Sequence, residues 1–397
     1  MEQAELTALL TAEGLRMIDE VGPLAGATEV AAAVSRLRAA GHSPDLVSAV
    51  VGQAHLRVRA APKFGPFADR MLFTRAGLEQ ATRLEIAARH AGRFRAAGLT
   101  RVADLGCGIG GDALGFAGIG LDVLAVDADE TTAALAAYNL APFGESVTVR
   151  HGFAEDTDLT GVDAVWLDPA RRTAGHSETS RTNPDDWSPS LDWAFALASR
   201  LPTGIKLGPG LDRRMIPNDV EAQWISVDGS TIELVLWSGA LRRGGVRRAA
   251  LVSRGGSTHE LTAATDAEDE PVRELGAFVH EPEGAVIRAR LIGDVARDLQ
   301  AGMLGDGVAY LTSDAALTNP FVQSFRVREV MPVKVPTINA ALRTHGIGTI
   351  EIKKRGIDVD PAQFRRKLTL RGDASATLIL ARVGDKGQRI AILADRV

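Results

Sequence analysis

A short apolar segment runs directly into a cluster of glycines, reading VADLGCGIGG over residues 102–111. Gly106, Gly108 and Gly110 lie where a strand is expected to turn into the N-terminus of a helix. Glycines leave such a turn open, so a ligand can approach the backbone N–H groups closely. The spacing also satisfies the G-x-G-x-x-G pattern of dinucleotide-binding turns, which does not by itself distinguish one nucleotide ligand from another.

Two carboxylates near this turn indicate which ligand it binds. Asp104 stands just before the glycines, where its charge repels a pyrophosphate but suits the cationic methionine end of S-adenosylmethionine. Asp127 ends the next apolar segment, at a position where a carboxylate accepts hydrogen bonds from both ribose hydroxyls. We therefore expect S-adenosylmethionine as the cofactor. An NAD-dependent oxidoreductase is the alternative that the glycine pattern leaves open.

A further corner of the same site follows the apolar segment 147–151, where the adenine ring is expected to lie. The predicted cofactor-binding residues are Asp104, Gly106, Gly108, Gly110, Asp127, Gly152, Phe153 and Ala154. Cys107 lies inside the turn but has no base near it in sequence, so we interpret it as a small structural residue. As the single cysteine, it excludes an intramolecular disulfide and the C-x-x-C zinc spacings, and we expect no metal.

The segment WLDPARR at residues 166–172 carries the groups expected at the reacting end of the site. Asp168 and Pro169 follow an apolar run, and the carboxyl ends of parallel strands face the ligand crevice in sheets of this kind. We predict that both are catalytic, with the Asp168 carboxylate and the Pro169 carbonyl orienting the acceptor. Positioning is the main requirement, because the sulfonium of the cofactor is already activated.

Two arginines follow the predicted catalytic pair. Guanidinium groups bind phosphate through paired hydrogen bonds, which makes Arg171 and Arg172 candidates for contacts with the substrate. A structural ion pair with Asp185 or Asp186 is an equally simple alternative. These aspartates lie in the long polar loop 173–189, which is expected to cover the substrate.

Lys206 lies in another apolar segment, at a strand end that is expected to be buried. A buried lysine needs a partner. Three interpretations follow: Lys206 pairs with Asp168, it contacts a substrate phosphate, or it extends along the sheet edge to solvent.

The elements that position these residues follow from the hydrophobic pattern. Apolar runs alternate with helical periodicity through the middle of the chain, as in a doubly wound parallel sheet, and Asp228–Gly229 is a hairpin signal between two later runs. The expected strands are Arg101–Leu105, Asp122–Asp127, Val147–His151, Val162–Asp168, Gly204–Leu207, Gln223–Val227 and Thr231–Trp237, with helices at Asp112–Gly118, Asp129–Leu140 and Leu191–Leu201. The pattern predicts the α/β class with a Rossmann-like sheet of seven strands.

Composition shifts suggest three parts along the chain. Residues 1–75 are expected to form a helical segment, 76–254 the domain with the parallel sheet, and 276–397 a small α+β domain after a linker at 255–275. Within these parts the periodicity predicts helices at Glu29–Ala40, Pro44–Val51, Thr74–Ala97, Pro336–His345 and Pro361–Lys367, a connector at Ala61–Phe73, and strands at Arg326–Val330, Thr349–Ile352, Leu368–Leu370 and Ala376–Ala381.

Two basic clusters lie in the last part of the chain. The first is Lys353, Lys354 and Arg355, and the second contains Arg365, Arg366 and Lys367 with Arg371 close behind. If short elements bring both to one surface, they form a footprint for a phosphate backbone. Glu351, Asp358 and Asp360 dilute the charge, and an ordinary solvated face is the alternative.

The composition of the whole chain limits what it binds and where it resides. With 397 residues and a net charge of −5, nucleic-acid binding requires a local patch rather than a basic molecule. The N-terminus has Glu2 and Glu5 where a secretory signal has basic residues, and no apolar stretch approaches the length of a membrane helix. We expect a cytoplasmic protein that does not contact the membrane.

The turn at 104–111 and the pair Asp168-Pro169 resemble those of class I S-adenosylmethionine-dependent methyltransferases. In that family an Asp-Pro-Pro-aromatic motif occurs in enzymes that methylate exocyclic or amide nitrogens, and the aromatic residue stacks on the target base. Here Ala170 and Arg171 occupy the last two positions. The resemblance therefore implies an orienting role for Asp168 and leaves methylation of a base nitrogen open.

The chain as a whole resembles a bacterial group of methyltransferase-domain proteins that end in a THUMP-like domain. The resemblance rests on FGPFADRMLFT (64–74), WLDPARR (166–172), Trp187-Ser188-Pro189, EIKKRGIDVD (351–360) and LRGDASAT (370–377). THUMP domains are RNA-binding modules, which implies a structured RNA, such as rRNA or tRNA, as the partner. The RNA candidates are then Arg171, Arg172, Lys206, Lys353, Lys354, Arg355, Arg365, Arg366 and Arg371. A binding protein that keeps the cofactor fold without catalysis is the alternative.

Overall fold

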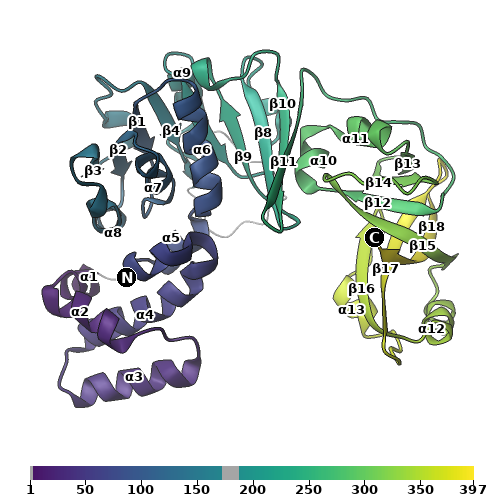
Figure 1. Cartoon of the computed structure of the whole chain (residues 1–397), viewed down its shortest axis with the longest axis horizontal. Helices are drawn as coiled ribbons and strands as arrows, with labels where there is room; N and C mark the ends of the chain where they lie inside the picture. The colour runs from purple at the N-terminus through teal and green to yellow at the C-terminus, as the bar shows by residue number, and fades with distance from the viewer. Residues whose placement is uncertain (1–2, 172–186) are drawn as a thin grey trace. The chain divides into compact units, whose positions relative to one another are not determined.

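The structure is a computed structural model that describes residues 3–171 and 187–397, with Arg171 described by its backbone. Within these ranges no helix is long and apolar enough to cross a membrane. The strands form a nine-stranded sheet, a seven-stranded sheet and a two-stranded ribbon of β5 (Ala170–Arg171) and β6 (Trp187–Ser188). The α/β class expected from the sequence is confirmed (Figure 1).

The first hundred residues are helical. Their elements are α1 (Gln3–Leu9), α2 (Ala12–Val21), α3 (Ala27–Ala39), α4 (Pro44–Phe64), a 3₁₀ turn (Gly65–Arg70), α5 (Arg75–Gln80) and α6 (Leu84–Ala96). The Ser43 hydroxyl accepts a hydrogen bond from Leu46 N and caps α4, which begins with Pro44 at its first turn. The expected connector at Ala61–Phe73 was too long, because α4 continues to Phe64 before the 3₁₀ turn.

The single helix expected over Thr74–Ala97 was wrong, because the chain breaks between α5 and α6. Ala81 leaves the helical conformation, with ψ of 138°. The Lys63 ammonium donates to the carbonyls of Leu78, Glu79 and Ala81 at 2.7, 2.8 and 2.9 Å. It thereby satisfies carbonyls that a continuous helix would have bonded to its own N–H groups. These hydrogen bonds come from another helix, so no local pattern in the sequence indicates them.

The nine-stranded sheet has the order β11-β10-β8-β9-β7-β4-β1-β2-β3. Its strands are β1 (Arg101–Leu105), β2 (Asp122–Asp127), β3 (Val147–His151), β4 (Ala164–Leu167), β7 (Thr203–Leu207), β8 (Glu221–Val227), β9 (Ser230–Trp237), β10 (Arg248–Arg254) and β11 (Ser257–Ala263). The pairs β1–β2, β2–β3, β1–β4 and β4–β7 are all parallel. All five predicted parallel strands are confirmed, three of them to the residue.

The hairpin β8–β9 is also confirmed. Asp228 and Gly229 have φ of 47° and 83°, the positive pair that a two-residue hairpin turn requires. The expected count of seven strands was too low, because β10 pairs parallel with β8 and β11 pairs antiparallel with β10. Residues 257–263, expected as part of a linker, are strand β11. The turn that joins it to β10 is Gly255–Gly256, with φ of 56° and 82°.

Helices α7 (Gly111–Gly118), α8 (Glu130–Leu140) and α9 (Leu191–Ala198) connect the parallel strands. An aromatic cluster fills the core beside α6, where the Phe94 ring lies 6.3 Å from that of Trp166, and the Trp166 and Trp237 rings are 5.7 Å apart. A Cβ on Gly204 would lie 2.7 Å from Trp166 and 2.9 Å from Trp237. Glycine is therefore needed at the second position of β7 so that both indoles fit.

Two buried side-chain amides attach the N-terminal helices to this sheet. Gln53 of α4 both donates to Phe73 O and accepts from Phe73 N, at 2.7 and 2.9 Å. Asn139 of α8 does the same for Leu72, at 3.0 and 2.7 Å, and also donates to Ile109 O at 2.9 Å. The stretch 72–73 therefore has its backbone polar groups satisfied as a strand would, without belonging to a sheet.

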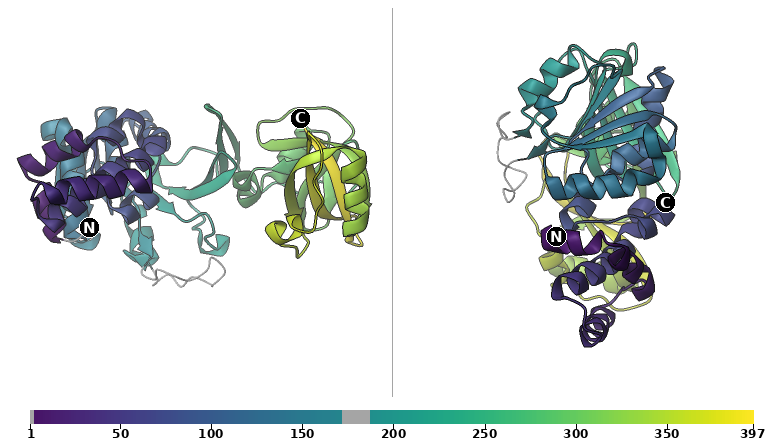
Figure 2. Two further views of the ribbon diagram at one scale, coloured as in Figure 1. Left: turned by 90° about the horizontal axis from the view of Figure 1, so that it is seen from below. Right: turned by 90° about the vertical axis from the view of Figure 1, so that its left-hand side faces the viewer.

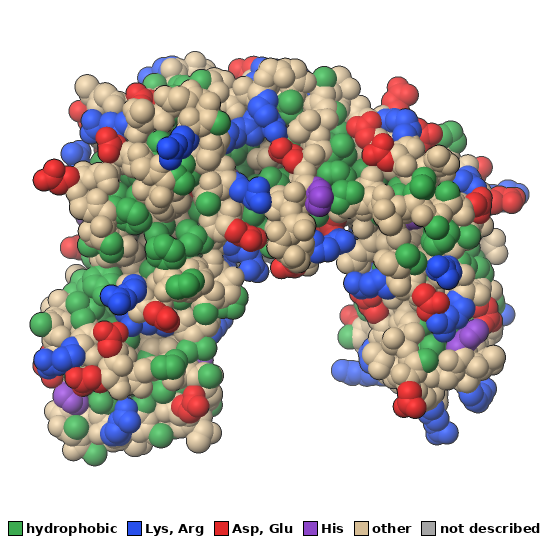
Figure 3. All heavy atoms as spheres, viewed as in Figure 1, with side chains coloured by type: hydrophobic (Ala, Val, Ile, Leu, Met, Phe, Trp, Pro, Cys, Tyr) green, Lys and Arg blue, Asp and Glu red, His purple; other side chains and the backbone are tan. Residues whose placement is uncertain are grey.

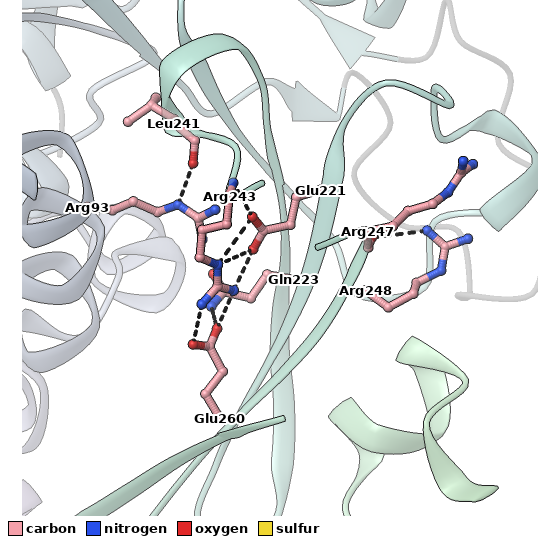
Figure 4. A network of polar contacts seen from close by, with 8 residues as sticks. All are labelled: Arg93, Glu221, Gln223, Leu241, Arg243, Arg247, Arg248 and Glu260. Atoms are coloured by element: carbon pink, nitrogen blue, oxygen red, sulfur yellow. Dashed lines mark hydrogen bonds and ion pairs between the residues drawn. The ribbon is translucent and has the colours of Figure 1, made fainter. Parts of the chain in front are cut away.

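By compactness the chain divides into two units. One comprises residues 1–207, 217–219 and 236–242, and the other residues 208–216, 220–235 and 243–397. In the second unit, the buried Glu221 and the partly exposed Glu260 bind Arg243 at 2.6 and 2.8 Å (Figure 4). The predicted division into segments 1–75, 76–254 and 276–397 stays a prediction.

The second unit contains the seven-stranded sheet, in the order β13-β14-β12-β15-β18-β17-β16. Its elements are β12 (Phe278–Pro282), α10 (Gly284–Ala289), α11 (Ile292–Asp298), β13 (Gly302–Gly305), β14 (Val308–Ser313), β15 (Val322–Pro332), α12 (Val335–Thr344), β16 (Ile347–Arg355), α13 (Pro361–Arg365), β17 (Ala374–Val383) and β18 (Gln388–Arg396). The sheet and its helices appear in green and yellow in two further views (Figure 2). The expected helices and three of the four expected strands are present; Leu368–Leu370 is not a strand, and Leu368 and Leu370 pack against the core cluster that contains Ile338 of α12 and Phe364 of α13.

A fully buried histidine lies in the middle of this sheet. His280 Nδ1 is 2.8 Å from Ser324 Oγ on β15, and Nε2 is 2.9 Å from Ser313 Oγ on β14. Burial lowers the pKa of His280 to about 4. The imidazole is therefore neutral in the folded protein at pH 6, where much of the unfolded chain carries a proton on it.

We predict that His280 makes the protein less stable in acid. Between pH 6.5 and about 4 the unfolded chain binds the proton and the folded chain does not, so the free energy of unfolding falls as the pH falls. The loss attributable to His280 is about 3 kcal/mol. Denaturant unfolding at several pH values checks this against His280→Gln, which cannot titrate. Parallel pH dependences for the two proteins would contradict it.

Candidate active site

The glycine turn has the open backbone that the sequence predicts. Gly106, Gly108 and Gly110 have φ of 84°, 56° and 87°, a region that side chains disfavour. The N–H groups of Gly106 and Cys107 both donate to Val126 O of β2, at 2.9 and 3.0 Å. The turn is therefore fixed to the neighbouring strand at the carboxyl edge of the sheet.

Two of these glycines differ in what surrounds them. A Cβ on Gly106 would lie 2.8 Å from the carbonyl oxygen of Asp168, so this glycine brings the turn against the end of β4. A Cβ on Gly108 would meet no described atom within 4 Å. Gly108 therefore borders open space at the turn, where a ligand can approach the backbone.

The carboxylate of Asp127 is oriented by backbone N–H groups. Its Oδ2 accepts from Gly108 N and its Oδ1 from Asp129 N, both at 2.9 Å. Burial raises the pKa of Asp127, and the two backbone hydrogen bonds oppose that shift. Each oxygen keeps a further lone pair, so the carboxylate can still accept from a diol, as the sequence interpretation requires.

Asp104 is the most unusual group of the site. It is 1% exposed, and neither of its carboxylate oxygens has a hydrogen-bond partner among the residues that the structure describes. Burial first, and then the nearby Asp112 carboxylate, raise the pKa of Asp104 well above its usual value. A buried carboxylate without a partner is costly, and a cationic ligand donor would relieve that cost. This fits the expected role of Asp104 toward an ammonium group.

The remaining predicted cofactor residues lie beside these. Gly152 N donates to Asp127 O at 3.0 Å, which holds the corner Gly152–Ala154 against the end of β2. Phe153 is 59% exposed, an unusual state for a phenylalanine that makes its ring available for a flat ligand. Cys107 is buried, and burial raises the pKa of its thiol well above the usual value, which supports the structural interpretation of this residue.

Asp168 lies at the carboxyl end of β4, next to the glycine turn. Its N–H donates to Leu105 O of β1 at 3.1 Å, and its side chain is 35% exposed. Lys206 Nζ of β7 lies 2.6 Å from Asp168 Oδ2. Of the three interpretations of Lys206, the pair with Asp168 is the one that the structure contains. Pro169 follows and is buried.

Three residues around Lys206 were missed by the sequence interpretation. Lys206 Nζ also donates to Thr82 Oγ1 at 2.9 Å and lies 3.4 Å from Asp112 Oδ2. Asp112 in turn accepts from the Thr82 hydroxyl at 2.7 Å and lies 3.0 Å from His90 Nδ1. Burial alone would raise the pKa of Asp112, but Lys206, His90 and Thr82 outweigh it and hold that pKa well below its usual value. The acidic residue after the glycines was visible in the sequence, but its partners were not.

The two arginines after Pro169 are only partly described. Arg171 belongs to β5, which pairs with β6 through Arg171 and Trp187. Arg172, with Asp185 and Asp186, lies outside the described residues. Both the phosphate-binding and the ion-pair interpretations of these arginines stay predictions.

The basic residues of the C-terminal sheet separate into two groups. Lys353 and Arg355 face Glu281, at 2.6 and 3.9 Å, so their charges are paired. Arg365 donates to the carbonyl of Ile350. Lys354, Arg366 and Arg371 are exposed, and among the described residues no acidic partner lies within ion-pair distance of them. All of these residues belong to the second compact unit, whereas the glycine turn and Asp168 belong to the first.

The described residues contain no group of three or more His, Cys, Asp or Glu side chains that could hold a metal ion. The site combines an open glycine turn, the Asp127 carboxylate at the end of the second strand, the buried carboxyl group of Asp104 on the first and the lysine-paired carboxylate of Asp168 after the fourth. Such a set at the carboxyl edge of a parallel sheet is the arrangement expected of the class I fold that binds S-adenosylmethionine.

Comparison with known proteins agrees with that class. An uncharacterized S-adenosylmethionine-dependent methyltransferase of Mycobacterium tuberculosis, found in strains H37Rv and CDC 1551, is 30% identical over 88% of this chain and 95% of its own length. The chain therefore belongs to the S-adenosylmethionine-dependent methyltransferases, and S-adenosylmethionine is its cofactor. The predicted family and enzyme class are confirmed.

Other matches concern the fold and its parts. A crystal structure from Porphyromonas gingivalis W83, described as a candidate methyltransferase, superimposes with a TM-score of 0.70 at 19% identity and covers 90% of this chain and 92% of its own. Residues 322–396 match a family model described as THUMP domain-like, which confirms the predicted C-terminal domain type. Residues 2–60 match a domain of unknown function.

We predict that Gly108→Ala weakens cofactor binding far more than it weakens the fold. The added Cβ meets no described atom within 4 Å and protrudes into the open space where we expect the ligand to approach, and the left-handed backbone adds a strain of about 1 kcal/mol. Calorimetric affinity for S-adenosylmethionine should fall about tenfold or more. The matched control is Gly118→Ala, which also meets no atom within 4 Å and should leave affinity unchanged. Equal affinities for the two variants would remove Gly108 from the pocket.

Proposed function

We propose that this methyltransferase modifies a structured RNA, and that Asp168 and the carbonyl of Pro169 orient the acceptor group. The observation that carries the catalytic part is the state of Asp168. It is a partly exposed carboxylate at the end of the fourth strand, tied through one oxygen to a buried lysine and backed by the glycine turn. Such a carboxylate is held in one orientation toward the reaction site.

The ion pair with Lys206, whose Nζ lies 2.6 Å from Oδ2, positions the Asp168 carboxylate. We infer that this carboxylate accepts a hydrogen bond from an N–H or O–H of the acceptor. The bound cofactor supplies an electrophilic methyl group on its sulfonium. The contribution of the protein is to align the acceptor lone pair with that methyl, because proximity and orientation account for much of the barrier in such transfers.

An RNA partner is supported by the THUMP-like match and by the unpaired cations of the second unit. Lys354 alternates with Lys353 and Arg355 along β16, so it faces the opposite side of the sheet. That side carries α13, after which Arg366 and Arg371 follow. Figure 3 shows Lys and Arg side chains protruding at the lower end of this part of the molecule. Unpaired cations keep their full charge for phosphates.

The residues after Pro169 bear on the choice of acceptor. Ala170 is exposed and stands where related enzymes that methylate nitrogens have a second proline, and an arginine stands where they have the aromatic residue. A flat base would then need another surface to stack on. A protein that binds cofactor and RNA without transferring a methyl group is the alternative favoured by this difference.

We predict that Asp168→Asn separates binding from catalysis. The amide keeps the size of the side chain but loses the charge that pairs with Lys206 and orients the acceptor, so methyl transfer to cellular RNA should fall about a hundredfold. Affinity for S-adenosylmethionine should stay within about threefold of wild type, because Asp104, Asp127 and Gly108 are unchanged. Tritiated methyl transfer and calorimetry measure the two quantities.

The acceptor is found by mass spectrometry of RNA nucleosides from cells with and without the gene. A methylated nucleoside that is absent in the deletion strain, and restored by wild type but not by Asp168→Asn, would establish the proposal. Incorporation by the wild-type enzyme into a protein or small molecule, and not into RNA, would overturn the RNA part. Tight cofactor binding without incorporation anywhere would favour the inactive binding protein.

We predict that the unpaired cations, and not the paired ones, govern RNA affinity. Replacing Lys354, Arg366 and Arg371 together by Gln should weaken RNA binding and lower the slope of log affinity against log salt by about two to three. The matched control replaces Lys353 and Arg355 by Gln, which removes charges already paired with Glu281. That control should leave the salt slope unchanged and lower thermal stability instead. A reversed pattern would place the RNA on the other face of the sheet.

A further inference from the structure

We propose that Thr82 and Lys206 are positioning residues, which form with Asp112 a buried polar cluster that fixes the carboxylate of Asp168 toward the acceptor. The inference rests on the proposed function, because it explains how the orientation of Asp168 is maintained. The loop between α5 and α6, which carries Thr82 and contributes no group to the glycine turn, would then affect catalysis.

The first observation is that the Lys206 ammonium is saturated by partners on three different elements. It binds Asp168 Oδ2 at 2.6 Å and Thr82 Oγ1 at 2.9 Å, with Asp112 Oδ2 at 3.4 Å. Its side chain is only 10% exposed. Moving a buried ammonium away from its partners costs several kcal/mol, so its position is narrowly defined. Asp168 is tied to that position.

The second observation is that Asp112 is itself held. It lies in the first turn of α7, accepts from the Thr82 hydroxyl at 2.7 Å, and pairs through its other oxygen with His90 Nδ1 at 3.0 Å. The centroid of the His90 ring lies 4.4 Å from that of Trp166, two residues before Asp168, with the two rings tilted by 33°. Both oxygens of the Asp112 carboxylate thus have partners, and these contacts hold the side chain in its orientation toward Lys206.

The third observation concerns Thr82, which joins the two charges. Its hydroxyl accepts from Lys206 and donates to Asp112, so a single side chain sets their separation. The loop that carries it contacts two other helices. The Lys63 ammonium of α4 binds the carbonyls of Leu78 and Glu79 at the end of α5 and that of Ala81 in the loop. Gly111 of α7 lies close to the same loop, because a Cβ there would be 3.7 Å from Thr82 N.

These contacts form a continuous path from the N-terminal helices to the acceptor carboxylate: Lys63, the α5–α6 loop, Thr82, Lys206 and Asp168. None of the hydrogen bonds on this path involves Gly108 or Asp127. A fault in the path should therefore misplace the acceptor and leave cofactor affinity unchanged. A residue that only supported the fold would lower the amount of folded protein and not the turnover of each folded molecule.

A matched pair at Thr82 tests this. Thr82→Val keeps the shape and removes the hydroxyl, whereas Thr82→Ser keeps the hydroxyl and loses a methyl group. At saturating cofactor and RNA we expect Thr82→Val to lower kcat about ten- to a hundredfold, with Kd for S-adenosylmethionine within about threefold of wild type. Thr82→Ser should retain kcat within about threefold. Both variants are assayed per folded molecule, as determined by thermal unfolding.

Lys206→Met provides the second measurement. It should lower kcat at least as much as Thr82→Val, and the effect of Thr82→Val should largely vanish in the Lys206→Met background, because residues of one network are not additive. The proposal is overturned if Thr82→Val and Thr82→Ser have the same kcat, or if cofactor affinity falls in parallel with kcat. If Lys206→Met does not fold, the Thr82 pair alone decides. Absence of transfer by the wild-type enzyme would instead reject the proposed function.

Discussion

The buried ammonium of Lys206 is the interaction on which the reacting end of this protein depends. A lysine at the end of a central strand, flanked by Asp112 and Asp168, has no stable alternative to the pairing seen here. Each neighbour is placed by a different element: β4 carries Asp168, α7 carries Asp112, and the α5–α6 loop carries Thr82. The Lys206 ammonium therefore fixes the positions of these three elements relative to one another.

The glycine turn and the segment around Asp168 are also linked by close packing. Gly106 allows the glycine turn to touch the carbonyl of Asp168, and the N–H of Asp168 donates to the carbonyl of Leu105 on the neighbouring strand β1. The glycine turn and the end of the strand that carries Asp168 therefore pack directly against each other. Asp104 adds to this region a buried carboxyl group whose oxygens have no hydrogen-bond partner among the described residues.

The sequence was sufficient for features whose signals are local. We could predict the glycine turn, the five parallel strands and the Asp228–Gly229 hairpin, because turn glycines and short apolar runs are patterns of only a few residues. Strands β10 and β11 were missed, although Gly255–Gly256 was a signal for their turn. Thr82, His90 and Asp112 were missed because their contacts are long-range. Thr82 and Lys206 are 124 positions apart in the chain, and hydrophobic periodicity does not predict a contact of this kind. The separation of Lys354 from Lys353 and Arg355 required the strand register.

The amides of Gln53 and Asn139 have a consequence for what counts as the catalytic portion of this protein. Residues 72–73 pass between α4 and α8 with their peptide groups bonded on both sides, and Asn139 extends the bonding to the glycine turn at Ile109. Gln53 lies within the stretch that matches a domain of unknown function, residues 2–60. Cutting the chain at the end of that stretch would strip two buried peptide groups of their partners beside the cofactor turn. A fragment that begins after residue 60 therefore lacks the contacts of Gln53 with Phe73, and the stretch 2–60 contributes to the scaffold that holds the glycine turn.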